Sequence, residues 1–226
     1  MERQKKITAD GSHTIFEPGL DVTYHSVFGA IQESRHVYIQ SGLQYMIRQR
    51  DIASINILEV GFGTGLNVLL TLLEATERNL NVHFHAIEPF PLTAGELLEL
   101  NYCAVLNRPD SETVYKQMHQ SSWNMLVPLS SSFSLYKDLT TLQAFQSSRL
   151  FNLIYYDAFA PTVQPELWTT EIFRKLLHFM EPGGAWVTYS SKSAVRRALT
   201  DVGFSVEKIP GPAHKREMIR AVKPKE

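Results

Sequence analysis

The stretch LEVGFGTGLN, residues 58–67, decides how this sequence of 226 residues folds. An apolar run contains the acid Glu59, and glycine then follows at every second position, at Gly61, Gly63 and Gly65. Glycine allows a sharp backbone turn and a close approach to a ligand, because no Cβ stands in the way. We therefore expect a buried strand, a ligand-binding turn and a helix in this order.

Short apolar runs and longer amphipathic segments alternate on both sides of this turn. The pattern predicts strands at 55–61, 82–88, 132–138, 150–159, 184–190, 204–210 and 217–223, and helices at 64–78, 91–103, 165–180 and 193–203. Such alternation is typical of an α/β fold with a doubly wound, mostly parallel sheet, here of seven strands, whose ligand binds at the carboxyl ends of the strands. The last two strands are expected to form a hairpin.

Residues 1–50 lack this alternation. They show extended segments and turns, followed by a helix at 33–50. We interpret residues 1–50 as an N-terminal extension that packs on the core, and residues 51–226 as the domain itself.

Composition excludes several classes of protein. No apolar run approaches the roughly 20 residues that a membrane helix needs, and the N-terminus shows no signal peptide, so we expect a cytoplasmic protein. The single cysteine, Cys103, excludes an intrachain disulfide and a multi-cysteine metal site. His83 and His85 are interpreted as structural, so no metal is expected. The sequence does not define an oligomeric state, and a monomer is the working expectation.

Charge is unevenly distributed along the chain. The net charge of -1 argues against a general nucleic-acid coat, but residues 191–226 carry nine Lys and Arg against four Asp and Glu. This basic end is either a solvated surface or a local patch for a polyanion such as RNA.

The glycine turn and the acids after the strands indicate which cofactor binds. The spacing is G-x-G-x-G, not the G-x-G-x-x-G of dinucleotide-binding proteins. Glu59 would repel a pyrophosphate but can pair with the ammonium of an amino-acid moiety. Glu88 ends the second strand, where an acid accepts hydrogen bonds from ribose hydroxyls, and Asp138 ends the third strand, within reach of an adenine amino group. This set favours S-adenosylmethionine over NAD.

Each of these residues also has a purely structural interpretation. The glycines can serve close packing, Glu88 can be a neighbour of a helix N-cap, and Asp138 can cap a helix over 139–145. These alternatives stay open on the sequence alone.

The stretch YYDAFAP, residues 155–161, is predicted to form the reaction end of the site. Asp157 stands at the end of the most apolar strand, so its carboxyl is expected at the cofactor edge of the sheet. A carboxylate there can accept the N–H bonds of an amine and aim its lone pair at a methyl group. Phe159 can stack on a flat base, and Pro161 fixes the turn. The structural alternative is that Asp157 caps a turn and that Phe159 is core.

The motifs taken together resemble the methyltransferase module of the MnmC family. They are VGFGTGLN (60–67), EPFPLT (88–93), DAFAP (157–161), PELWT (165–169), PGG (182–184) and HKREM (214–218), with a similar leader at 24–39. The resemblance implies a Rossmann-like, class I S-adenosylmethionine-dependent methyltransferase. Its implied reaction is methyl transfer to the exocyclic amine of 5-aminomethyl-(2-thio)uridine at the wobble position of tRNA, giving 5-methylaminomethyl-(2-thio)uridine.

The resemblance also implies roles for individual residues. The expected catalytic residues are Asp157, Phe159 and Pro161. The expected cofactor-binding residues are Glu59, Gly61, Gly63, Gly65, Asn67, Glu88, Asp138 and Asp157. The residues expected to meet the anticodon loop of the tRNA are Tyr24, Ser26, Lys215 and Arg216. Many MnmC proteins also carry a flavin-dependent oxidase domain, for which this sequence shows no second glycine loop.

The sequence also leaves three alternative functions open. One is a methyl- or aminopropyltransferase acting on a small-molecule amine. The second is an NAD(P)-dependent oxidoreductase, which the glycine spacing and Glu59 disfavour. The third is a non-catalytic RNA-binding module that keeps the fold, which the net charge and Asp157 disfavour.

Overall fold

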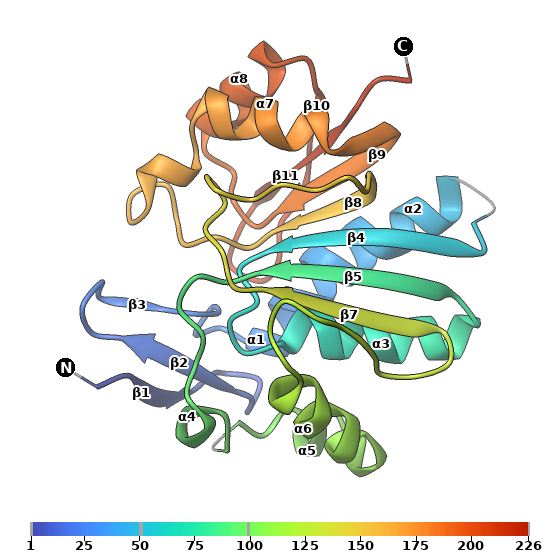
Figure 1. Ribbon diagram of the computed structural model, residues 1–226. Helices are drawn as coiled ribbons and strands as arrows, with labels where there is room; N and C mark the ends of the chain where they lie inside the picture. Colours follow the sequence, from blue (N-terminus) through green and yellow to red (C-terminus); the bar gives the residue numbers. More distant parts are fainter. Residues whose placement is uncertain (1, 50–51, 99, 226) are drawn as a thin grey trace.

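A computed structural model describes residues 2–49, 52–98 and 100–225 of the chain. Its main sheet contains β4 (Ser54–Val60), β5 (Asn81–Ile87), β6 (Leu126–Pro128), β7 (Phe133–Asp138), β8 (Phe151–Tyr156), β9 (Met180–Thr188), β10 (Ser205–Pro210) and β11 (Glu217–Val222). These eight strands lie in the order β10-β11-β9-β8-β4-β5-β7-β6 (Figure 1).

The strand order places a ligand-binding edge between β4 and β8. The chain runs outward from β4 through β5 to β7 on one side, and from β8 to β9 on the other, with all of these pairs parallel. The hairpin of β10 and β11 adds to β9 in antiparallel fashion. In doubly wound sheets the ligand binds where the strand order reverses, at the carboxyl ends of the strands.

Both faces of the sheet are buried beneath helices. Ile57 on β4 packs in one apolar cluster with helix α3 (Leu66–Arg78), whereas its neighbour Leu58 packs in a second cluster with α7 (Thr170–His178) and α8 (Ser193–Asp201). On β8, Tyr155 and Tyr156 divide between the same two clusters. Successive side chains of a strand point to opposite faces, so near-continuous apolar runs are what a sheet covered on both faces requires.

Two predictions about elements are corrected here. The sheet has eight strands and not seven, because β6 pairs antiparallel with β7 at the edge. β6 is only three residues long, is largely exposed and contains Pro128, so neither alternation nor an apolar run marks it. The helix expected over 91–103 is instead two short pieces, α4 (Ala94–Leu98) and α5 (Tyr102–Val105). A 3-10 turn (Pro109–Ser111) and α6 (Glu112–Gln120) follow.

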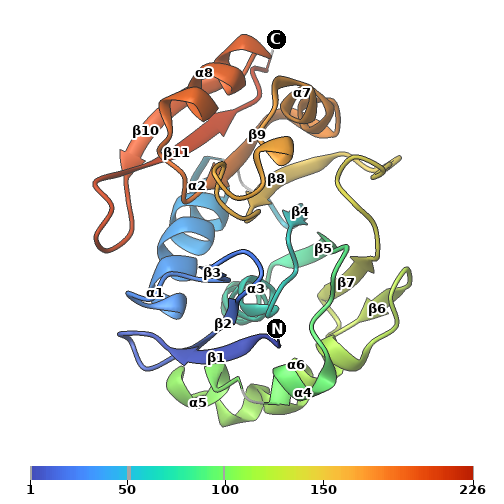
Figure 2. The same cartoon turned by 90° about the vertical axis from the view of Figure 1, so that its left-hand side faces the viewer.

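The N-terminal part forms a small sheet and a long helical segment. The sheet is β1 (Gln4–Ile7), β2 (His13–Glu17) and β3 (Val22–Thr23), and it lies at the edge of the main sheet where β4 and β5 end (Figures 1 and 2). The helical segment is α1 (Ala30–Ser34), the π-helix η1 (Arg35–Leu43) and α2 (Gln44–Gln49). Tyr38 and Leu43 of η1 are buried in the same cluster as α3.

The boundary that the sequence suggested between residues 50 and 51 lies outside the described residues. Among residues 2–49, 52–98 and 100–225, every helix is too short or too polar to cross a lipid bilayer.

Candidate active site

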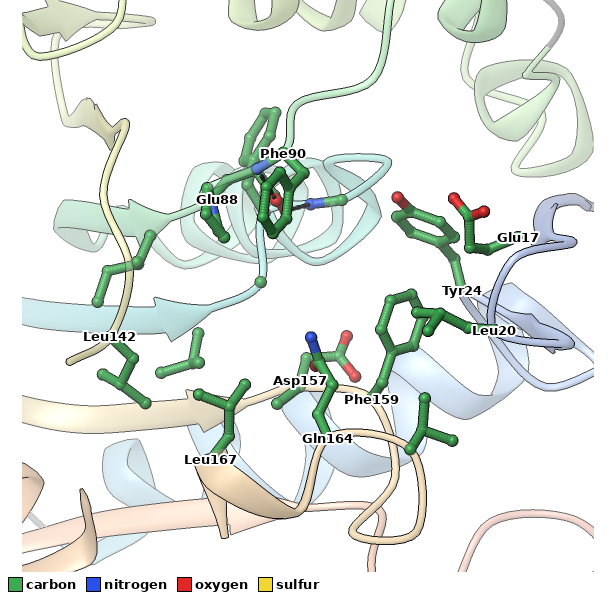
Figure 3. Close-up of a pocket in the computed structure, with 18 of the residues that line it drawn as sticks. Glu17, Leu20, Tyr24, Glu88, Phe90, Leu142, Asp157, Phe159, Gln164 and Leu167 are labelled. Carbon is green, nitrogen blue, oxygen red and sulfur yellow. Dashed lines mark hydrogen bonds between the residues drawn. The ribbon is translucent and has the colours of Figure 1, made fainter. Parts of the chain in front are cut away.

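A cavity of about 520 Å³ opens at the carboxyl ends of β4, β5 and β8. It is lined by the glycine turn after β4, the segment after β5, the loop after β8 and residues of the N-terminal sheet. Figure 3 shows Asp157 and Gln164 pointing into it, with Tyr24 and Phe159 on one side and Glu88 on the other. Its volume lies within the usual range of small-molecule sites, roughly 300–1,000 Å³.

Each glycine of the turn is required for a different structural reason. All three have positive φ, at 93° for Gly61, 49° for Gly63 and 70° for Gly65. A Cβ on Gly61 would lie 2.9 Å from the carbonyl oxygen of Asp157, so this glycine lets β4 and β8 come together at the site. A Cβ on Gly63 would lie 3.1 Å from the ring of Tyr24, at the cavity wall. A Cβ on Gly65 would lie 2.7 Å from the side chain of Met118, so close packing explains the glycine at this position.

Three residues that the sequence did not single out hold this turn in place. The carbonyl oxygen of Thr64 accepts a hydrogen bond from the Tyr115 hydroxyl at 2.8 Å and lies 3.1 Å from a ring nitrogen of His119. The Tyr102 hydroxyl donates to the hydroxyl of Thr64 at 3.1 Å. All three come from α5 and α6, a region without a recognisable motif, so only the tertiary structure could find them.

Glu88 lies in the cavity wall directly after β5. Its carboxyl accepts hydrogen bonds from the backbone N–H groups of Gly63, at 3.1 Å, and Phe90, at 2.8 Å. Burial raises the pKa of Glu88, and these two bonds partly oppose that effect. The acid predicted from the sequence is therefore fixed at the mouth of the glycine turn, where a ribose would lie.

The amide of Asn67 joins two carboxyl groups. Its Nδ2 donates to Oε1 of Glu59 and to Oδ2 of Asp157, both at 2.8 Å. Asn67 and Asp157 line the cavity, whereas Glu59 lies behind them and is only 1% exposed. Oε2 of Glu59 is buried without a hydrogen-bond partner, and burial raises the pKa of this carboxyl well above its ordinary value. Glu59 therefore does not line the cavity itself and is connected to it by its hydrogen bond with Asn67.

Asp157 combines a cavity position with an unusual proton affinity. Burial raises the pKa of its carboxyl from 3.8 to about 7, although Tyr38, Asn67 and Lys215 act in the opposite direction. The backbone N–H of Asp157 donates to the carbonyl oxygen of Val60 at 3.0 Å, which fixes this residue against the end of β4. A carboxyl with a pKa near 7 can hold or release a proton at neutral pH.

Aromatic residues form one side of the cavity. The rings of Tyr24 and Phe159 meet edge to face, with centroids 5.2 Å apart. The indole N–H of Trp168 donates to the carbonyl oxygen of Phe159 at 2.8 Å and so fastens the loop. Trp168 is itself buried, so this bond ties the loop to the core. Gln164 was not predicted; it stands before the PELWT motif, and its amide points into the cavity beside Asp157 (Figure 3).

Other predicted site residues lie outside this cavity. Asp138 is the last residue of β7, and its carboxyl lies 3.1 Å from Nε2 of His85, so His85 has a carboxylate partner that the sequence did not reveal. No helix follows Asp138 in the described segment 139–149, so the N-cap interpretation is wrong. Pro161 is not among the lining residues. Within the described ranges, no group of three or more His, Cys, Asp and Glu side chains is placed to hold a metal ion.

Two of the residues expected to meet RNA, Ser26 and Lys215, are joined through Glu33. Glu33 accepts hydrogen bonds from the backbone N–H of Ser26, at 3.1 Å, and from Nζ of Lys215, at 3.2 Å. Lys215 also lies 4.3 Å from the centre of the Tyr189 ring. Lys215 is thus held in an ion pair, while the Arg216 side chain is exposed.

Comparison with known proteins agrees with this geometry. A family described as S-adenosyl-L-methionine-dependent methyltransferase matches residues 135–224. The crystal structure of MnmC2 from Aquifex aeolicus superposes with a TM-score of 0.80 at 25% sequence identity, over 100% of this chain and 70% of that one. The fold is that of an S-adenosylmethionine-dependent methyltransferase. The expected fold class is confirmed.

Curated relatives confirm the resemblance to MnmC. The bifunctional MnmC of Paraburkholderia xenovorans, named for tRNA 5-methylaminomethyl-2-thiouridine biosynthesis, is 30% identical over 91% of this chain and 33% of its own length. The protein of the same name from Burkholderia multivorans is 32% identical over the same shares. The chain therefore spans about a third of the length of these relatives.

The cavity residues fit S-adenosylmethionine. Gly61 and Gly63 line the cavity with backbone alone, and Glu88 presents a carboxyl there that hydrogen bonds hold in place and that ribose hydroxyls could contact. Asn67 and Asp157 offer polar groups on the opposite side of the glycine turn, where an amino-acid moiety would lie. Tyr24 and Phe159, whose rings are in contact, line the same cavity.

Proposed function

We propose that this chain methylates the exocyclic amine of 5-aminomethyl-(2-thio)uridine at the wobble position of tRNA, using S-adenosylmethionine. The product would be 5-methylaminomethyl-(2-thio)uridine. The observation that carries the proposal is Asp157, a carboxyl with a pKa of about 7 that lies between the glycine turn and an aromatic wall. The names of the curated MnmC relatives supply the substrate class.

The cofactor would be held by the glycine turn and the acids after the strands. Gly61 and Gly63 leave room for it, Gly65 packs the turn, and Glu88 accepts from the ribose. Asn67 would contact the amino-acid moiety, with Glu59 as the anchor behind it. For Asp138 the proposed adenine contact requires that its carboxyl exchange its present partner, His85.

Asp157 would act on the amine of the substrate. S-adenosylmethionine, when bound, supplies an electrophilic methyl group. The Asp157 carboxylate accepts N–H bonds from the aminomethyl group and takes up a proton, which leaves the nitrogen lone pair available and correctly oriented. Its raised pKa suits this exchange, because the carboxyl can carry the proton at neutral pH.

The flat base would lie against the aromatic wall. Phe159 offers a ring face, Tyr24 holds that ring edge to face, and Pro161 constrains the loop. Gln164 has an amide that can pair with the polar edge of a uracil.

The anticodon loop would bind beside this opening. Tyr24 and Ser26 belong to the segment that borders the cavity, and Arg216 is free to meet a phosphate. Lys215 would act from its ion pair with Glu33. Residues 1–50 would serve as an extension that completes the site over the methyltransferase domain of 51–226. The proposed enzyme would act as a monomer, in the cytoplasm with its tRNA substrate, and without a metal.

The test is nucleoside mass spectrometry. The protein is incubated with S-adenosylmethionine and tRNA from cells that lack the gene, and the tRNA is then digested. We expect the aminomethyl nucleoside to convert to the methylaminomethyl nucleoside, and the Asp157→Ala variant to lose turnover by orders of magnitude while still binding S-adenosylhomocysteine. If no tRNA nucleoside gains a methyl group although the cofactor binds, the proposal fails and a small-molecule amine becomes the better candidate.

A further inference from the structure

Two loops that are far apart in the sequence are fastened together next to the cavity. One follows β3 and contains residues 24–29; the other joins β10 to β11 and contains residues 211–216. Glu33 bonds to both, through the N–H of Ser26 and Nζ of Lys215. A ring nitrogen of His36 lies 2.8 Å from the carbonyl oxygen of Pro210. Figure 2 shows the turn between β10 and β11 reaching down to α1.

Each loop contributes one aromatic ring to an exposed stack. The rings of Phe28 and His214 lie nearly parallel, with centroids 4.0 Å apart and an interplanar angle of 30°. Phe28 keeps 47% of its surface exposed, and His214 is also exposed. Burial therefore does not explain the stack, because much of the phenyl ring stays in water.

The backbone of His214 indicates that this arrangement is imposed. His214 has a φ of 65°, in the left-handed region that costs free energy for residues other than glycine. Strained residues of this kind cluster at ligand-binding sites. Here the strained residue places its imidazole ring in a stack whose two side chains both remain exposed.

The stack lies beside the reaction end of the site. Tyr24 lines the cavity four residues before Phe28, and Lys215, next to His214, is close enough to lower the pKa of Asp157. The exposed Arg216 follows directly. An open aromatic face with a neighbouring cation is the combination by which proteins bind an unpaired nucleobase and its phosphate.

We propose that Phe28 and His214 form a stacking platform for a base of the RNA strand adjacent to the methylated nucleotide, with Arg216 at the neighbouring phosphate. This inference rests on the proposed tRNA substrate and adds to it a second base-binding site. A bound base would extend the two-ring stack to three and cover the exposed phenyl surface.

The test uses an anticodon stem-loop RNA with aminomethyluridine at the wobble position and 2-aminopurine at a nucleotide beside it. Wild-type protein should quench the 2-aminopurine fluorescence, since the fluorophore stacks on the platform. In Phe28→Ala and His214→Ala the quench should disappear and KM for the stem-loop should rise about 10-fold or more. Their kcat and their dissociation constant for S-adenosylhomocysteine should stay unchanged.

Matched variants separate stacking from folding. Phe28→Tyr keeps an aromatic face and should behave as wild type, whereas Phe28→Leu keeps apolar volume without a ring and should behave as Phe28→Ala. Met125→Ala removes a side chain that is 58% exposed elsewhere and should change nothing.

Three outcomes would overturn the inference. If the wild type methylates the stem-loop and Phe28→Ala retains its KM and quench, the platform alone is refuted. If the wild type methylates no tRNA, the proposed function fails as well. If sedimentation shows that Phe28→Ala separates a dimer without weakening RNA binding, the surface serves self-association instead.

Discussion

The protonation of Asp157 should govern how the stability of the protein depends on pH. Replacing this residue by asparagine keeps the shape and an acceptor oxygen for Asn67 but removes the charge. The folded-state pKa of about 7 exceeds the ordinary value of 3.8 by about 3 pKa units, and at 1.36 kcal/mol per unit the ionised carboxyl costs about 4 kcal/mol.

The sign follows from which state binds the proton more tightly. Below about pH 4 the carboxyl is protonated in both states and costs nothing. As the pH rises, the unfolded chain ionises first, so stability falls until the folded carboxyl also ionises near pH 7. Urea unfolding of the ligand-free protein should therefore show Asp157→Asn gaining about 2.5 kcal/mol over wild type between pH 5 and pH 8.

Asp110, on the surface, provides a control in which the effect of pH on stability has the opposite sign. Asp110 is exposed, and its hydrogen bond with Arg108 lowers its pKa, so Asp110→Asn should lose stability relative to wild type once the pH exceeds about 4. If the advantage of Asp157→Asn is the same at pH 5 and pH 8, burial does not raise the pKa of Asp157 and the argument from the site is refuted.

The other predictions concern activity and binding. The value of kcat/KM should rise with pH through about 7, and Asn67→Ala should move this midpoint upward, because the amide of Asn67 stabilises ionised Asp157; a pH profile that is identical in the variant would contradict this. Glu88→Ala should weaken the binding of S-adenosylhomocysteine about 10-fold or more by calorimetry, and an unchanged dissociation constant would refute the ribose contact. Gly63→Ala should destabilise the protein by about 1 kcal/mol in thermal unfolding, since its φ of 49° is strained for alanine and its Cβ would meet Tyr24; a stability equal to wild type would show that the turn adapts.

Much of the site could be predicted from the short-range spacing of residues in the sequence. Glycine at alternate positions after an apolar run predicted the turn, and Glu88 and Asp157 were predicted because each directly follows a parallel strand. The carboxyl ends of parallel strands meet at one edge of a sheet, so residues that follow such strands converge even when they are distant in the chain. Glu88 and Asp157 accordingly line one cavity.

Contacts between segments without a motif escaped prediction. The anchors of Thr64 come from α5 and α6, a region in which no motif marks the residues that contact the glycine turn. Edge strand β6 is too short for periodicity to reveal it. The contact of His85 with Asp138 could not be predicted either, because only the pairing of β5 with β7 brings the two side chains together.

The sequence by itself determined the α/β class, the glycine turn and the acids that end the strands, since these depend on local periodicity and on the conformational freedom of glycine. Only the tertiary structure decided that one amide, Asn67, would hold both Glu59 and Asp157 and that burial would raise their pKa values. It also joined Glu33 to Lys215, 182 residues apart. Proton affinity and long-range pairing depend on which groups exclude water together, and that is fixed only when the chain has packed.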